Sequence, residues 1–232
     1  LKFTGGTGDI TFADTAPVFT PGDNFNTVLY TGNSASDNSG TTQSITGVGF
    51  QPDLVWIKRR DGAENHYVHD STRGSTKQIY TNLTNAEYDE SNSVISFDAD
   101  GFTLGGYNGS NNIGETYVAW SWKAGGAARN NTDGTITSQV SANVDAGFSI
   151  VQYTGTGSLA TVGHGLNQPV ELILVKNTSA SASWAVYSAP TGINKFLELN
   201  SPGGTTSYSN YWGAATPTND VFGVVNGNFN NN

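Results

Sequence analysis

One sequence pattern occurs twice in the chain, and this repeat constrains the fold more than any other feature. Phe25–Gly32 resembles Phe148–Gly155 at an offset of 123 positions (148 minus 25). Gln51–Lys58 resembles Gln168–Lys176, and from its final lysine onward the offset is 118 (176 minus 58). We therefore expect two domains of one fold. A residue with a special role in one copy can then be compared with its counterpart in the other.

The composition indicates that both domains are all-β. The chain has 232 residues, of which 29 are glycine and only 12% are charged. Its apolar runs are short and rich in Val, Ile, Phe, Tyr and Trp, with Gly, Asn and Asp between them, which is typical of strands joined by turns. Long helical sequences are instead rich in Ala, Leu, Glu and Lys. We expect two tandem antiparallel β-sandwiches with Greek-key or jelly-roll wiring.

Strand candidates follow in order along each copy. Leu54–Ile57 is apolar on both faces, which predicts a central strand. In Thr116–Trp122, the side chains of Val118, Trp120 and Trp122 share one face. The other expected strands span 26–31, 66–70, 77–81, 94–97 and 101–104 in the first copy, and 148–153, 172–176, 184–187, 195–199 and 221–225 in the second.

The predicted domain organisation has four parts. Composition and the repeat assign an N-terminal arm or connector to 1–22, the first sandwich to 23–124, a Gly/Ala/Asn-rich linker to 125–136, and the second sandwich to 137–232.

The second copy lacks a counterpart to the last strand of the first. Phe102–Leu104 matches Phe222–Val224 at an offset of 120 (222 minus 102), which aligns Asn232 with Asn112. The strand after Asn112 therefore has no partner in the second copy. Since a strand that closes one sandwich should not be dispensable in its repeat, we expect the natural polypeptide to continue past residue 232.

Charge and cysteine content exclude several classes of function. The net charge is −9 and the isoelectric point is about 4.5, so the chain repels phosphate backbones and we expect no nucleic-acid partner. The chain has no cysteine, which excludes disulfides, thiolate nucleophiles and cysteine-ligated metals. The chain contains no run of about 18 apolar residues, so we expect no membrane insertion.

Two histidines of the first copy, His66 and His69, form the segment that most resembles a metal or acid–base site. On a strand they point to opposite faces, and the helical spacing of a zinc-binding pair does not apply. The second copy has Trp184 and Tyr187 at these positions. We therefore expect both histidines to have packing roles, and the same for His164, which lies in a turn.

Acidic residues suggest two further kinds of site. Ser96–Gly101 resembles the start of a calcium-binding loop, but its first position is serine and its twelfth is Tyr107 rather than glutamate, so we interpret Asp98–Gly101 as a hairpin turn. Glycoside hydrolysis needs two carboxylates in one cleft. The candidate carboxylates are Asp53, Glu64, Asp70, Glu87, Asp89, Glu90 and Glu115. The second copy does not retain the first three of them. We therefore predict no enzymatic activity, and we expect no metal and no cofactor.

Half of the ten basic residues lie in one stretch, namely Lys58, Arg59, Arg60, Arg73 and Lys77. One interpretation is an anion or acidic-glycan site. The favoured interpretation is an exposed hairpin whose charge is balanced by nearby acids, which are Asp53, Asp61, Glu64 and Asp70.

Aromatic side chains are the candidates for a ligand site, because an exposed ring face stacks on the C–H-rich face of a sugar. For Trp56, Trp120 and Trp122, core packing is at least as good an interpretation. The ligand-binding candidates are Tyr88, Tyr107, Trp184, Tyr208, Tyr211 and Trp212.

Four motifs together resemble a known family. Gly49–Lys58, Asp70–Gly74, Asp100–Gly105 and Thr116–Lys123 look like a tandem domain in virion proteins of tailed phages that infect marine bacteria, including cyanobacteria. Those proteins are usually labelled tail-fibre or structural proteins, and the resemblance covers residues 24–232 in two passes. It implies a concanavalin-like or jelly-roll sandwich, a virion location and trimerisation. It carries over no catalytic residue.

We therefore expect a non-enzymatic phage appendage, such as a tail fibre, spike or capsid fibre, that presents loops to a host surface. Its ligand would be a bacterial surface glycan, and its partners would be copies of itself in a homotrimer and other virion proteins. The mature protein would be extracellular, on the particle. The alternative is a purely structural decoration or adaptor protein, and a polysaccharide depolymerase is less favoured.

Overall fold

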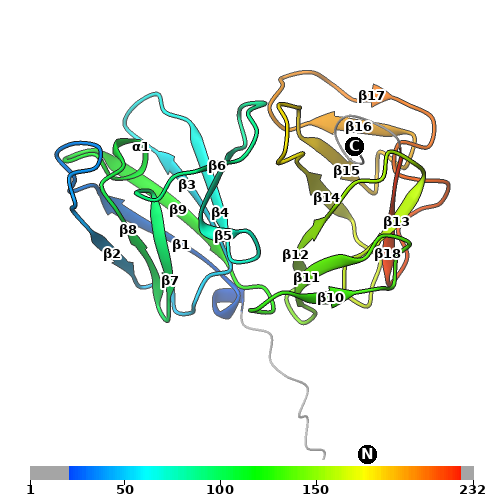
Figure 1. The fold of residues 1–232 in the computed structure, drawn as a ribbon, viewed down its shortest axis with the longest axis horizontal. Coiled ribbons are helices and arrows are strands. Elements are labelled where there is room, and N and C mark those ends of the chain that lie inside the picture. Colours follow the sequence, from blue (N-terminus) through cyan, green and yellow to red (C-terminus); the bar gives the residue numbers. More distant parts are fainter. Residues whose placement is uncertain (1–20, 226–232) are drawn as a thin grey trace, which may run out of the picture.

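The computed structural model describes residues 21–225, which form two β-sandwiches lying side by side (Figure 1). All strand pairs between named strands are antiparallel. Helix within these residues is limited to the 3-10 turn η1 (Pro21–Asp23) and the one-turn helix α1 (Asn108–Asn111). The prediction of an all-β chain with two tandem antiparallel sandwiches is therefore confirmed. Most of the predicted N-terminal arm lies outside the described residues.

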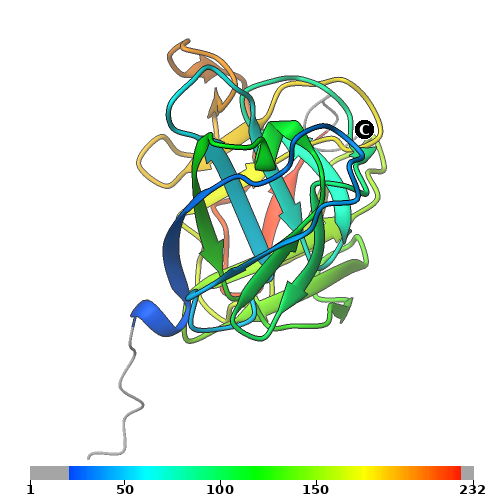
Figure 2. The ribbon, with the colours of Figure 1, turned by 90° about the vertical axis from the view of Figure 1, so that its left-hand side faces the viewer.

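The N-terminal sandwich packs a six-stranded sheet against a three-stranded one, and Figure 2 looks onto it from its outer side. The larger sheet has the order β1 (Phe25–Thr31), β9 (Thr116–Trp122), β3 (Leu54–Arg59), β4 (His66–Asp70), β5 (Gly74–Tyr80) and β6 (Tyr88–Asp89). The smaller sheet has the order β2 (Gln43–Thr46), β8 (Gly101–Leu104) and β7 (Val94–Asp98).

The core of this sandwich is formed by alternate side chains of the two sheets. Tyr117 and Ala119 of β9 are fully buried with Val55 of β3, and they pack with Phe102 and Leu104 of β8. The intervening residues of β9 point to the other face, as the period of two predicts. β3 lies between β9 and β4, so the prediction of a central strand is confirmed.

The C-terminal sandwich contains three sheets in the described residues. The first has the order β10 (Arg129–Asn131), β11 (Ser138–Asn143) and β12 (Phe148–Tyr153). The second has the order β14 (Leu172–Val175), β15 (Ala185–Ser188), β16 (Lys195–Glu198) and β17 (Thr206–Ser207). The third pairs β13 (Ala160–Gly163) with β18 (Val221–Val224). Tyr153 and Ile173 pack against both core clusters, one centred on Trp212 and the other on Phe222. The segment predicted as a linker, 125–136, thus contains β10 and pairs with the sandwich that follows it.

Strand registers repeat between the sandwiches at the offsets found in the sequence. Val55 pairs with His69 in the first sandwich, and Ile173 pairs with Tyr187 in the second, 118 positions later in each case. The same offset relates the pairs Val68–Ile79 and Val186–Leu197, and the pairs Lys77–Asp89 and Lys195–Ser207. β8 and β18 correspond at an offset of 120, and each pairs with a short strand, β2 or β13. The repeat is therefore a repeat of wiring as well as of sequence.

The two sandwiches differ at the position that β9 occupies in the first. In the first, β9 lies between β1 and β3 and pairs with both. The counterparts of β1 and β3 are β12 and β14, and no strand of residues 21–225 lies between them.

The hairpin interpretation of the calcium-like segment is confirmed. β7 and β8 form a hairpin in which Asp98 pairs with Gly101. The Asp98 carboxylate accepts hydrogen bonds from the hydroxyl groups of Ser96 and Thr103. The Asp100 carboxylate instead accepts from the backbone N–H groups of Gly47 and Gly49, at 3.1 and 2.6 Å. Asp98 thus fastens the hairpin itself, whereas Asp100 fastens it to the segment after β2 that contains Gly47 and Gly49.

Truncation of the central core phenylalanine should destabilise the fold strongly. Phe102→Ala removes a fully buried ring from between the two sheets, and we expect the free energy of unfolding to fall by about 3–5 kcal/mol. Leu159 is 63% exposed, so Leu159→Ala should stay within about 0.5 kcal/mol of the parent. Urea unfolding followed by tryptophan fluorescence measures both values, and equal losses would contradict this description of the core.

Candidate functional site

A groove of about 940 Å³ lies between the two sandwiches, at the upper end of the size range of ligand sites. One wall is the outer face of the large N-terminal sheet, represented by Leu54, Trp56 and Val68. The other wall is formed by β12 and β14 of the C-terminal sandwich. In Figure 1 these two sets of strands face each other across the middle of the molecule.

Trp184 anchors the contact between the two sandwiches beside the groove. Its side chain is 5% exposed and packs with Val68 and Ile79 of the other sandwich. Its indole Nε1–H donates to the backbone oxygen of Tyr80 at 2.7 Å. The counterpart of Trp184 in the first copy is His66, whose Nδ1 accepts a hydrogen bond from Trp56 within its own sandwich. The exchange of histidine for tryptophan therefore supplies the contact between the two sandwiches.

Loops from the two sandwiches are bonded together near Trp184. The backbone N–H of Glu87 donates to the carbonyl of Thr178 at 2.9 Å. The backbone N–H of Ala182 donates to the carbonyl of Thr84 at 2.8 Å. These two bonds run in opposite directions between the segments, as in a short antiparallel ladder, and they fix one loop against the other.

A second contact fastens the sandwiches where the chain crosses between them. Trp122 of β9 stacks on Phe148 of β12, with ring centroids 6.1 Å apart and an angle of 24° between the planes. The buried carboxylate of Asp53 accepts hydrogen bonds from the backbone N–H groups of Ala124 and Gly126, at the start of the connection. The sandwiches are thus joined by side chains and backbone at two separate places.

Arg73 lines the groove but has no free hydrogen-bonding edge. Its Nε donates to the carboxylate of Asp70 at 2.5 Å, and its Nη1 donates to Glu87 at 2.8 Å and to the backbone oxygen of Lys77. Its Nη2 lies 3.4 Å from the backbone oxygen of Val68. The side chains of Arg73 and Asp70 are 8% and 6% exposed. Because the guanidinium is already paired, it organises the turn after β4 and is not available to an anionic ligand.

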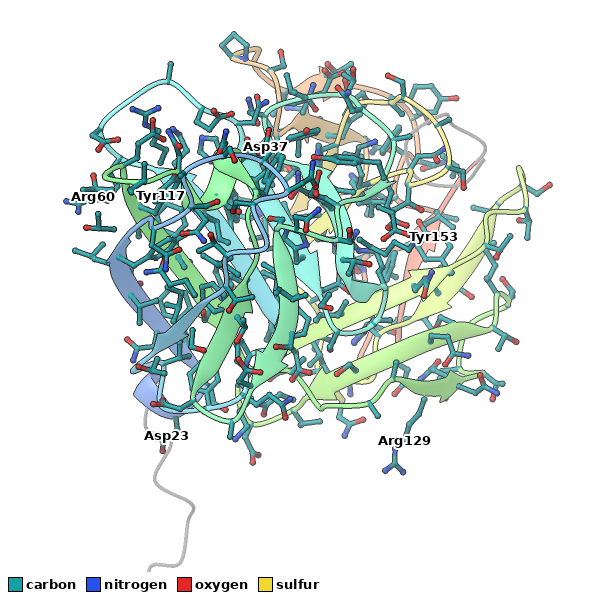
Figure 3. All side chains as sticks on the ribbon, turned by 60° about the vertical axis from the view of Figure 1, so that its left-hand side comes forward. Asp23, Asp37, Arg60, Tyr117, Arg129 and Tyr153 are labelled. Atoms are coloured by element: carbon teal, nitrogen blue, oxygen red, sulfur yellow. The ribbon has the colours of Figure 1, made fainter. Side chains whose placement is uncertain are left out.

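The rest of the basic stretch is also largely paired. Arg59 bonds to Asp61 and Glu115, and Lys77 bonds to Asp89. Arg60 extends into solvent at the edge of the molecule, as does Arg129 of the second sandwich (Figure 3). The charges are therefore balanced locally, but of the four acids expected in this role only Asp61 and Asp70 form ion pairs with these bases.

Lys176 is a groove residue whose pKa is changed by burial. Burial lowers the pKa of its ammonium group to about 8, and Nζ donates to the backbone oxygen of Asn177 at 2.7 Å. Its counterpart, Lys58, donates in the same way to the backbone oxygen of Arg59, also at 2.7 Å. Since both copies make this contact, it belongs to the shared strand end rather than to chemistry in the groove.

The histidines have structural partners. His69 is fully buried, and its Nδ1 lies 2.7 Å from the backbone oxygen of Ser75, to which it must donate. Its Nε2 faces Gln78 and Ser93. His66 lies on the opposite face of β4, next to Trp56, so the predicted divergence of the two rings is confirmed. His164 accepts at Nδ1 from the backbone N–H of Leu166 and is 2% exposed.

The carboxylates proposed from the sequence are spread over separate contacts. Asp53 caps the connection between the sandwiches, and Glu64 accepts from the hydroxyl group of Tyr67 at 2.6 Å. Asp70, Glu87, Asp89 and Glu115 bond to the arginines and the lysine described above. Glu90 accepts from the backbone N–H of Asn92. Each carboxylate thus holds a neighbouring loop or strand in place.

Most of the aromatic candidates for ligand stacking lie in the interior. Trp212 is fully buried, Tyr211 is 4% exposed and stacks on Phe196, and Trp184 fills the contact between the sandwiches. These three rings therefore offer no open face to a ligand. Tyr107 packs against the N-terminal core.

Two tyrosine candidates remain near the surface. Tyr88 stacks on Tyr80 and shares a hydrogen bond with its hydroxyl group, which leaves it half-buried. Tyr208 is 50% exposed in the loop after β17. Of the six candidates, Tyr208 presents the most open ring.

The sequence did not indicate that certain strand residues line a groove. Ile150, Leu172 and Leu174 were assigned to strands, but alternation indicates only which side chains share a face, not whether that face is covered. The signal that could have identified them is the missing counterpart of β9, because no strand of residues 21–225 then lies between β12 and β14.

Two further observations concern the described residues as a set. Between residues 21 and 225, no three His, Cys, Asp or Glu side chains are grouped as a metal ion would require. No helix in this range is long and apolar enough to cross a bilayer.

The chain belongs to the family described as Domain of unknown function (DUF7483), whose model matches residues 20–232. No curated protein and no solved structure gives a significant match to the chain.

Burial of His69 predicts a loss of stability in mild acid. Burial lowers the pKa of this imidazole to about 4, whereas an unfolded chain has a pKa near 6.5. Below pH 6.5 the unfolded state binds a proton that the folded state does not. Stability should therefore fall between pH 6.5 and 4, by about 3 kcal/mol in total from this residue. The pKa values of His66 and His164 are also lowered by burial and act in the same direction.

The variant His69→Asn isolates the share of this ring, since its amide can still donate to the carbonyl of Ser75. Urea midpoints measured from pH 7 to pH 4.5 should fall less steeply in the variant than in the parent. Parallel pH profiles would show that His69 is not the residue responsible.

Proposed function

We propose that this member of the DUF7483 family is a non-enzymatic building block of a bacteriophage appendage, and that it presents a loop of its C-terminal sandwich to a bacterial surface glycan. The phage assignment is supported by the sequence resemblance to virion proteins. The attachment role is supported mainly by one observation, the open ring of Tyr208 on a fixed loop.

The loop that carries Tyr208 has the character of a binding surface. Residues 202–210 are all exposed and consist largely of Gly, Ser, Thr, Asn and Tyr. Such loops combine adaptable hydrogen-bonding groups with a rigid aromatic contact. A sugar can stack on the tyrosine ring while neighbouring hydroxyl and amide groups bond to its hydroxyls.

The ring of Tyr208 is held in position by the core beneath it. Its backbone N–H donates to the carbonyl of Asn194 at 2.9 Å, and its ring meets Tyr211 edge-on at 5.5 Å. Tyr211 in turn stacks on Phe196 of β16. A pre-positioned ring loses little conformational freedom on binding, which favours recognition by a small contact area.

The purely structural alternative is favoured by the contact between the two sandwiches. Trp184, the bonded loops and the Trp122–Phe148 stack join the repeats at two places. A spacer or decoration protein needs such fixed geometry between repeats, and attachment through Tyr208 does not depend on it.

Removal of the Tyr208 ring should weaken glycan binding without changing the fold. We expect Tyr208→Ala to lose about tenfold in affinity, equivalent to about 1.4 kcal/mol, because a stacking contact is lost. Tyr208→Phe keeps the ring and should retain most of the binding, and Leu159→Ala changes an exposed site elsewhere and should retain all of it. Binding to arrays of bacterial lipopolysaccharides and capsular polysaccharides provides the measurement.

If the parent binds no polysaccharide, or if Tyr208→Ala binds as well as the parent, the attachment role is wrong and the structural alternative takes its place.

Location and assembly are tested on the particle and on the isolated chain. Antibodies against the chain should label purified phage particles in electron micrographs, on tail or capsid fibres. Light scattering should give three times the 24.4 kDa of one chain if the predicted homotrimer forms. A protein found in the lysate but on no particle would contradict the virion assignment, and a monomer at high concentration would contradict the trimer.

A further inference from the structure

We propose that the groove between the two sandwiches is a binding site for a neutral oligosaccharide, which lies in the slot and stacks on the indole ring of Trp56. Tyr208 does not line the groove, so this site is separate from the loop that carries it. The inference rests on the side chains, the charge balance and the rigidity of the groove, and it is independent of the proposed role in attachment.

The two walls of the groove are equivalent surfaces of the two copies. Leu54 and Trp56 of β3 belong to one wall. Leu172 and Leu174 of β14, which are their counterparts 118 positions later, belong to the other. The two leucines alternate with Ile173, whose side chain packs into the core, so they lie on the outer face of their sheet. The groove therefore places an aromatic surface opposite an aliphatic one.

Trp56 is a ring held in place at the groove. Its Nε1–H donates to Nδ1 of His66 at 3.2 Å. Its ring meets Trp120 edge-on, with centroids 6.0 Å apart and 75° between the planes. The side chain is nevertheless only half-buried, and it lines the groove. A fixed ring loses little conformational freedom on binding, and its face accepts the C–H-rich face of a sugar.

Trp122 provides a second aromatic contact on the same wall. Trp120 of β9 lies directly opposite Trp56 of β3, so Trp122 is the diagonal neighbour of Trp56, about 7–8 Å away. Trp122 is half-buried, lines the groove and is held by its stack on Phe148. One ligand can therefore contact both rings. Together with the volume of the groove, this spacing favours a chain of two or more sugars over a single one.

The charge balance of the groove favours a neutral ligand. Within residues 21–225, the charged side chains that line it are two acids, Asp70 and Glu171, and two bases, Arg73 and Lys176. Arg73 is paired with Asp70, and the ammonium group of Lys176 donates to the backbone oxygen of Asn177. Glu171 is exposed, and its carboxylate repels an acidic sugar, as does the net charge of −9.

Polar side chains beside the apolar walls suit the hydroxyl groups of a sugar. Gln152 and Gln168 both line the groove and are exposed. On β12, Gln152 alternates with Val151 and Tyr153, which pack into the core, so it lies on the outer face. An amide group donates and accepts hydrogen bonds, as a hydroxyl group does. The groove thus combines ring faces with groups that can bond to the rim of a sugar ring.

The slot exists without a ligand because the sandwiches are fastened to each other at two places. Trp184 donates from its indole to the backbone oxygen of Tyr80 at 2.7 Å, and Trp122 stacks on Phe148. The walls therefore have a fixed separation. A preformed site binds with little cost in conformational entropy.

Titration with neutral hexasaccharides tests the proposal. The probes are cellohexaose, maltohexaose and the hexamer of N-acetylglucosamine, with hexagalacturonate as an acidic probe of the same length. We expect at least one neutral probe to shift the NMR signals of amides in β3, β12 and β14. Calorimetry should show that it binds at least about tenfold more tightly than the acidic probe. The same shifts should occur in Tyr208→Ala, which separates this site from the proposed role in attachment.

Substitutions on the two walls make the test sharper. Trp56→Leu gives the first copy the residue type of its counterpart, Leu174, and should weaken binding at least about tenfold, because the ring is lost. Trp56→Phe keeps an aromatic face and should bind within about threefold of the parent. Leu174→Trp fills the slot from the opposite wall and should also weaken binding at least about tenfold.

The matched control for the filled slot is Leu159→Trp, at an exposed site outside the groove, which should bind like the parent. Both leucines are exposed, at 42% for Leu174 and 63% for Leu159, so the urea midpoints of these two variants should equal that of the parent. A loss of binding in Leu174→Trp then reports on the groove and not on the fold.

Three results would overturn the proposal. The first is that no neutral hexasaccharide shifts the amides of the groove strands. The second is equal affinity for hexagalacturonate, which would contradict the neutral class of ligand. The third is unchanged binding by Trp56→Leu or by Leu174→Trp, which would place the sugar outside the groove.

Discussion

The N-terminal sandwich depends on the pairing of β9 with both β1 and β3. This one strand joins the beginning of the sandwich to its middle, and it supplies Tyr117 and Ala119 to the core. Its other face carries Trp120 and Trp122, and Trp122 stacks on Phe148 of the following sandwich. Closure of the sheet, packing of the core and contact with the neighbouring sandwich therefore all involve the same seven residues.

The two copies share backbone wiring and differ in the side chains that meet between them. The equivalent pairs Val68–Ile79 and Val186–Leu197 have the same register, so the strands are placed alike. At one position beside them, His66 keeps its hydrogen bond within its own sandwich, whereas Trp184 reaches the backbone of Tyr80 in the other. A tandem repeat of identical copies would lack this contact. Divergence at this strand end thus adds one of the two contacts that hold the sandwiches together.

Features set by a local sequence pattern could be predicted, whereas features set by contacts between residues far apart in the sequence could not. Strands such as β3 and β9 were identifiable because apolar and aromatic residues alternate or run together over a whole strand. Short strands such as β2, Gln43–Thr46, were missed because they are mostly polar and are set by pairing with β8 rather than by their own preference. The buried state of Trp212 and Tyr211 was also hidden, since a loop rich in Gly, Ser and Thr gives no sign that its aromatic residues turn inward. The groove escaped prediction because it arises where no strand of residues 21–225 lies between β12 and β14, and not from a local sequence pattern.

An apolar groove with tryptophan on one wall would ordinarily suggest a small-molecule site. Such a ligand would contact Trp56 on one wall and Leu174 on the other. Two charged groups that line the groove, Arg73 and Lys176, are already bonded to protein atoms. At these two residues the groove therefore offers a ligand no unpaired charge.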